Sequence, residues 1–181
     1  MRNFSPSFRI WHWLNAIAMF GLLITVVLRE SVMHKNNIGV IVQTKVAELG
    51  TVITDEQAVM IGKAVRSPMW DWHIYLGIAV AVLLLVRLAM VFKNGFGFDD
   101  NPQMQKVYRL YKAVYVLLAG MSISGLILYL KLAGGAKENI EMVHQYVGWG
   151  LFAFIAVHII GVVLAEKTDQ SGLVSRMING K

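Results

Sequence analysis

Long runs dominated by hydrophobic residues recur four times along the chain, separated by polar stretches. Arg87 is the one charge deep inside such a run. Each run is long enough to cross a hydrocarbon core of about 30 Å as an α-helix. The pattern predicts an all-α integral membrane protein, a four-helix bundle that forms one domain over residues 1–181. The predicted spans are approximately residues 10–28, 70–92, 110–131 and 142–165.

Composition agrees with this class and excludes others. The 181 residues are 56% hydrophobic, which is well above the share in ordinary soluble proteins. The chain has no cysteine, so it holds no iron–sulfur cluster, no disulfide and no covalently attached c-type haem. No phosphate-binding loop, dinucleotide fingerprint, Ser/His/Asp set or nucleic-acid signature is present. The net charge of +6 fits cytoplasmic loops that face anionic lipid better than it fits nucleic acid.

Charge also predicts the orientation. With the N-terminus inside, the larger share of the 17 Lys and Arg residues falls on the cytoplasmic side. Most of the others lie in one long outer loop, about residues 29–69, and long loops count less in this rule. We therefore predict a multi-pass membrane protein with a cytoplasmic N-terminus.

The outer loop is itself predicted to be helical. The residues from Thr54 to Gln57 have the form of a capping box and precede apolar positions at helical spacing. A second helix is predicted over about Ile38 to Leu49. Two interpretations remain open for this loop: a helical cover for the membrane surface, or a docking platform for a partner outside the membrane.

Two histidines interrupt the last apolar segment. His144 and His158 are 14 residues apart. At about 100° and 1.5 Å per residue, both imidazoles leave the same helix face, roughly 21 Å apart along its axis. One therefore lies near each membrane surface, which suggests two metal centres at two depths.

Two more histidines complete the pattern. His12 lies at the cytoplasmic start of the first span, and His73 lies at the outer start of the second. Depth alone therefore pairs His12 with His158 at the inner level, and His73 with His144 at the outer level. Two imidazoles per level are what two six-coordinate, non-covalently bound b haems require as iron ligands. A small residue that leaves room for a flat cofactor follows each histidine by about one turn: Ala16, Gly77, Gly148 and Gly161.

Other interpretations explain the four histidines less well. A single histidine in a span is often a buried hydrogen-bonding residue, but four at two depths are not explained in that way. A zinc or copper transport site is the rival metal interpretation. Such a four-histidine site requires all its ligands at one depth and usually acidic partners along a path. The histidines are instead divided between two depths roughly 21 Å apart, and no Asp or Glu lies inside the spans apart from Asp71 at an edge. His34, in the outer loop, breaks the pattern and is interpreted as a solvated residue.

Arginines near the inner level are candidates for contacts with haem propionates. Arg87 lies 14 residues after His73, on the same face at the opposite depth. A charge inside a span by default points to a function, although snorkelling to the inner interface is the alternative. Arg9 is a second cofactor-binding candidate. The polar residues inside the spans do not locate a quinone site; they are Asn15, Thr25, Ser122 and Ser124.

The four histidine motifs together resemble a known family. They are RIWHWLNA around His12, WDWHIYLG around His73, VHQYVGWG around His144 and AVHIIG around His158. In this combination the chain resembles the bacterial di-haem membrane cytochromes b of the cytochrome b561 type, over nearly its whole length. These include the cytochrome b subunits of nickel–iron hydrogenases, formate dehydrogenases and thiosulfate reductases. The long first outer loop is a departure from the family.

The resemblance implies two bis-histidine haems in the bacterial inner membrane, with quinone or quinol at one face. The predicted function is electron transfer within a respiratory chain, between the quinone pool and an extracytoplasmic partner. Candidate partners are a periplasmic cytochrome c, a dehydrogenase or a hydrogenase subunit; membrane lipid is the surrounding medium, and no nucleic acid is involved. Bis-histidine ligation fills both axial positions, which favours electron transfer over catalysis at the iron. Two alternatives remain open: a stand-alone superoxide:quinone oxidoreductase, as some relatives are, and a membrane anchor for a respiratory complex.

Overall fold

The computed structural model describes residues 4–95, 105–168 and 171–180, and this part of the chain is helical without strands. The helices are α1 (Pro6–Glu30), α2 (Lys35–Glu48), α3 (Asp55–Val65), α4 (Ser67–Asn94), α5 (Gln105–Tyr129), α6 (Lys137–Glu166) and α7 (Leu173–Ile178), with a short 3₁₀ turn, η2 (Gly134–Ala136), before α6.

Four helices are long and apolar enough to cross a membrane. They lie over Pro6–Glu30, Ser67–Lys93, Tyr108–Tyr129 and Gly134–Glu166. Large aliphatic side chains project from them, with exposed fractions of 67% for Ile17, 65% for Leu85 and 72% for Val116. Such faces are stable against lipid and unstable against water. The prediction of an all-α membrane protein with four spans is confirmed, while the cytoplasmic position of the N-terminus stays a prediction.

Contacts between residues divide the chain into two units. Unit 1 comprises Met1–Ile17 and Ile78–Lys181, and unit 2 comprises Ala18–Gly77. Helices α1 and α4 each run through both. The single di-haem domain stays a prediction.

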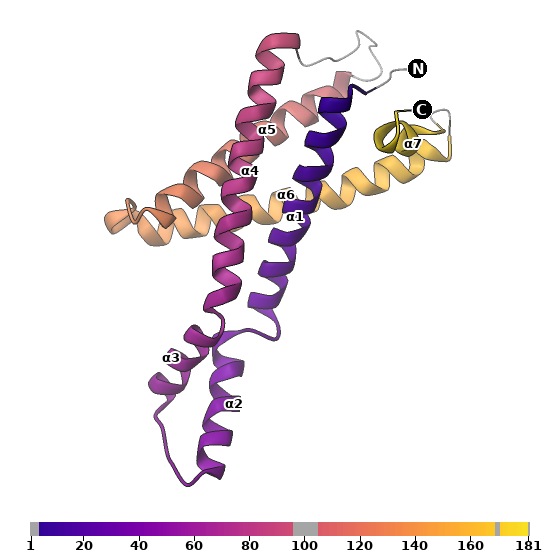
Figure 1. Cartoon of the computed structure of the whole chain (residues 1–181). Helices are drawn as coiled ribbons and strands as arrows, with labels where there is room; N and C mark the ends of the chain where they lie inside the picture. The colour runs from indigo at the N-terminus through magenta and orange to yellow at the C-terminus, as the bar shows by residue number, and fades with distance from the viewer. Residues whose placement is uncertain (1–3, 96–104, 169–170, 181) are drawn as a thin grey trace. The chain divides into compact units, whose positions relative to one another are not determined.

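In unit 2 the outer loop folds into the paired helices α2 and α3, which lie side by side (Figure 1). The predicted capping box is confirmed: the Gln57 backbone N–H donates to the Thr54 hydroxyl, and the Thr54 N–H donates to the Gln57 side chain. Two buried glycines allow the close approach. A Cβ on Gly39 would lie 3.3 Å from the backbone of Ala58, and a Cβ on Gly62 would clash with the Lys35 carbonyl oxygen.

In unit 1 helices α5 and α6 pack against each other, and α7 folds back beside the end of α6. The Glu166 carboxylate accepts the Gly172 N–H at 2.7 Å and the Val174 N–H at 3.1 Å, which fixes the start of α7. The start of α1 belongs to the same unit. Its Trp11 indole N–H donates to the Leu83 carbonyl of α4 at 2.7 Å, so the segment that carries His12 is tied to α4.

We expect Gly62→Leu to force α2 and α3 apart, because the added side chain meets backbone that cannot move aside. The expected cost is about 1–3 kcal/mol of local stability. Amide hydrogen exchange of the full chain should then rise by roughly fivefold or more across residues 35–65. Ala64→Leu is the matched control, since Ala64 is exposed on the same helix. Equal exchange in both variants would contradict the close packing at Gly62.

Candidate functional site

The structure brings together the two histidines predicted for the inner level. His12 on α1 and His158 on α6 belong to unit 1, and their ring centres are 6.2 Å apart with planes at 61°. Both side chains are half-buried. Two imidazoles that share one metal through bonds of about 2 Å have their centres roughly 6 Å apart. The observed separation therefore suits a metal held between the two rings.

Aromatic side chains surround this inner pair. The Phe154 ring stacks on His158, with centres 5.8 Å apart and planes at 19°. Tyr111 of α5 meets the same imidazole edge-on at 6.1 Å, and Trp13 meets His12 edge-on at 5.6 Å. Rings of this kind exclude water and leave few alternative orientations for the imidazoles. The inner pair is thus held mainly by packing against apolar surfaces.

Open space lies next to two of the predicted small residues. A Cβ built on Gly161 or on Gly77 would have no described atom within 4 Å, apart from the residue's own helix backbone and chain neighbours. Gly148 differs, because a Cβ there would lie 3.5 Å from the Met121 side chain. Gly161, one turn after His158, is exposed, so the described residues leave the space beside it unfilled.

Arg87 is buried among aromatic rings. Its exposed fraction is 6%, and its guanidinium carbon lies 4.8 Å from the ring centre of Phe8 and 5.5 Å from that of Trp11. Its Nε–H donates to the Tyr115 hydroxyl at 2.9 Å. Cation–π attraction of this kind stabilises a charge that water does not reach. The side chain is therefore held within unit 1 instead of snorkelling, and its contact with a propionate stays a prediction.

Arg9, the other arginine predicted to bind a cofactor, has buried guanidinium nitrogens that donate no hydrogen bond to a described residue. Its Nε and Nη1 atoms are buried and have no hydrogen-bond partner among the described residues. Nearly all buried polar atoms in proteins are hydrogen-bonded, so an orphaned guanidinium nitrogen indicates a missing acceptor. A carboxylate is the group that a guanidinium binds best. This environment fits a haem propionate next to the His12 segment.

The outer histidines fall in different units, so each is described alone and their pairing stays a prediction. In unit 2 the Nδ1 atom of His73 lies 2.8 Å from the Thr25 hydroxyl oxygen, and the Trp70 ring meets the imidazole edge-on at 5.2 Å. In unit 1 the Nδ1 atom of His144 lies 2.8 Å from the Ser124 hydroxyl oxygen. Sequence reasoning noted Thr25 and Ser124 only as polar residues and missed both contacts.

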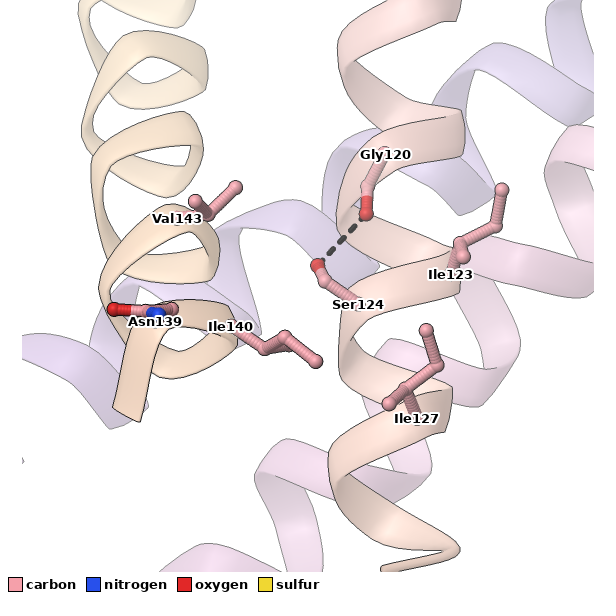
Figure 2. Close-up of a pocket in the computed structure, with 7 residues that line it drawn as sticks. All are labelled: Gly120, Ile123, Ser124, Ile127, Asn139, Ile140 and Val143. Atoms are coloured by element: carbon pink, nitrogen blue, oxygen red, sulfur yellow. Dashed lines mark hydrogen bonds between the residues drawn. The ribbon is translucent and has the colours of Figure 1, made fainter. Parts of the chain in front are cut away.

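Each hydroxyl also lines an apolar cleft. In unit 1 a cleft of about 260 Å³ lies between α5 and the start of α6, with Ser124 on one wall and Ile140 and Val143 on the other (Figure 2). In unit 2 a cleft of about 340 Å³ is lined by Thr25 of α1 and Trp72 of α4, among others. Each outer histidine is thus bonded to a residue that borders open apolar space.

The rival transport site finds no support in the described ranges. There, no three His, Cys, Asp or Glu side chains gather closely enough to hold a metal ion. The histidines occur instead as the close inner pair and as two separate histidine–hydroxyl contacts.

Comparison with known proteins adds one finding. A family model described as prokaryotic cytochrome b561 matches residues 3–180, which is nearly the entire chain. No curated protein and no solved structure matches the chain significantly.

We expect Arg87→Ala to destabilise unit 1 by about 2 kcal/mol, because it removes the cation–π contacts and the bond to Tyr115. For a chain of this length that corresponds to a fall in Tm of about 4–8 °C, measured on the detergent-purified protein. Arg87→Lys, which retains the charge, should lose less. The control is Arg109→Ala, since Arg109 is exposed on α5. Equal Tm values for Arg87→Ala and the control would show that the contacts of Arg87 with Phe8, Trp11 and Tyr115 contribute nothing to stability.

Proposed function

Because the chain belongs to the prokaryotic cytochrome b561 family, we propose that it carries electrons through two b-type haems between an extracytoplasmic redox partner and the quinone pool. Membership of the family establishes a multi-pass protein of the bacterial inner membrane that transfers electrons by b-type haem. The number of haems, their histidine ligands, the quinone and the partner belong to the proposal. The observation that carries it is the 6.2 Å separation of the His12 and His158 rings.

The proposal gives each histidine a defined task. His12 and His158 bind the inner haem iron, and His73 and His144 bind the outer one. A haem supplies an iron that takes up and releases single electrons. Two imidazoles bound to each iron would leave no position for oxygen or another small ligand. Trp13, Phe154 and Tyr111 keep water from the inner imidazoles, and the orphaned donors of Arg9 accommodate a propionate.

The quinone link rests on the location of the spans. Quinones dissolve in the hydrocarbon core, and the spans present exposed aliphatic side chains to that core, as the exposure of Leu85 and Val116 illustrates. A lipid-soluble quinone therefore reaches the bundle sideways without crossing water. On the outer side, the paired helices α2 and α3 provide a folded surface for a water-soluble partner.

We expect the purified protein to contain two low-spin b haems per chain, counted by the pyridine haemochrome method. His12→Ala and His158→Ala should each remove the same haem, and His73→Ala and His144→Ala should each remove the other. His34→Ala is the matched control and should retain both, because His34 lies in the segment between α1 and α2. A wild-type chain without haem would overturn the proposed function, and one haem per chain would overturn the two-level assignment.

The quinone link is tested separately in lipid vesicles. A short-chain quinol added to the oxidised protein should reduce the haems, as followed by the optical absorption of the reduced b haem. His158→Ala should lower the extent of reduction by about half, because one of two haems is missing, whereas His34→Ala should leave it unchanged. Haems that dithionite reduces but quinol does not would refute the quinone link and leave the haem assignment intact.

A further inference from the structure

Two hydroxyl side chains make the same arrangement in separate parts of the chain. The Thr25 hydroxyl oxygen lies 2.6 Å from the Leu22 carbonyl oxygen of its own helix and 2.8 Å from Nδ1 of His73. The Ser124 hydroxyl oxygen lies 2.7 Å from the Gly120 carbonyl oxygen, the bond drawn in Figure 2, and 2.8 Å from Nδ1 of His144. Each hydroxyl thus stands between a backbone carbonyl and an imidazole.

The chemistry of these groups determines where the protons lie. A hydroxyl has one proton to donate, and a carbonyl oxygen can only accept. The arrangement that makes both contacts therefore has the hydroxyl donating to the carbonyl and accepting from the imidazole. Nδ1 then carries the proton and Nε2 does not. An imidazole that is unprotonated at Nε2 is in the form that binds a metal through that atom.

Further contacts restrict the orientation of both rings. A Cβ on Gly125 would lie 3.1 Å from Cε1 of His144, so this imidazole rests against the backbone of α5. His73 is bounded by the edge-on ring of Trp70. Thr25 is only 6% exposed, so water does not compete for its hydroxyl. The tautomer and the direction of each ring are therefore set together.

The inner histidines are held differently. The described contacts of the His12 and His158 rings are with aromatic side chains, including Trp13 and Phe154. An acceptor on Nδ1–H makes an imidazole a more basic ligand, and a more basic ligand favours the oxidised state of the metal that it binds. The hydroxyl contacts thus distinguish the outer ligands from the inner ones.

We propose that Thr25 and Ser124 are positioning residues that hold His73 and His144 as Nδ1–H tautomers and thereby lower the reduction potential of the outer haem. This inference rests on the proposed function, because it requires these two histidines to be haem ligands. The hydroxyls do not touch the iron; they act through the imidazoles.

The test is a redox titration of the detergent-purified haem protein, in which the outer haem is the one that His73→Ala removes. Thr25→Val and Ser124→Ala should each increase the equilibrium constant for reduction of the outer haem by roughly threefold to tenfold, which is about 30–60 mV for a one-electron couple. The inner haem should not change. Thr25→Ser and Ser124→Thr keep a hydroxyl and should restore the wild-type potential.

Two matched controls separate this role from a general effect of losing a hydroxyl. Thr44→Val removes a hydroxyl that bonds to the Val40 carbonyl at 3.0 Å on α2. Ser122→Ala removes a serine two positions from Ser124, on another side of α5. Both should leave the outer potential unchanged.

The possible results are distinguishable. A normal haem content with unchanged potentials in Thr25→Val and Ser124→Ala overturns this inference and leaves the proposed function standing. Loss of the outer haem alone, restored by Thr25→Ser or Ser124→Thr, supports it. A wild-type chain that binds no haem overturns the proposed function itself.

Discussion

A polar side chain inside a hydrocarbon layer has no water to bond with, so it needs a partner within the protein or its cofactor. This constraint organises the polar residues of the spans. The Thr25 and Ser124 hydroxyls give their protons to backbone carbonyls, and their lone pairs accept from His73 and His144. On the proposed assignment, the second ring nitrogen of each of these imidazoles would bind a haem iron.

Arg87 meets the same constraint with aromatic side chains. The faces of Phe8 and Trp11 take the place of water around its guanidinium, and Tyr115 accepts from Nε. Because Phe8 and Trp11 belong to α1, these contacts also fix the start of α1 against α4. His12 follows Trp11 directly, so its position relative to His158 depends on how the Arg87 side chain is held. Stability and ligand geometry are therefore coupled at the inner level.

The sequence was sufficient to predict the features that depend on local patterns. Runs of apolar residues predicted four spans, and the capping box at Thr54 predicted the start of α3, because helix formation and capping depend on residues close together in the chain. The predicted topology, combined with position within the spans, also placed His12 and His158 at one depth. The partners of the outer histidines could not be predicted in this way. Ser124 and His144 belong to different helices, and no periodicity within one helix shows which side chains of two helices meet. The aromatic surroundings of Arg87 could not be predicted either, because in the sequence Phe8 and Tyr115 look like ordinary aromatic residues of a span.

The two levels differ in what surrounds their histidines. On the proposed assignment, hydroxyl acceptors would make the outer ligands more basic and favour ferric iron there. The described contacts of the inner rings are with aromatic side chains instead. Cations lie beside both levels: Arg87 contacts Phe8 and Trp11 next to His12, and Arg29 contacts Trp70, the ring that meets His73 edge-on. The hydroxyl contacts are therefore the feature that separates the two levels, and they would make the outer haem the harder one to reduce.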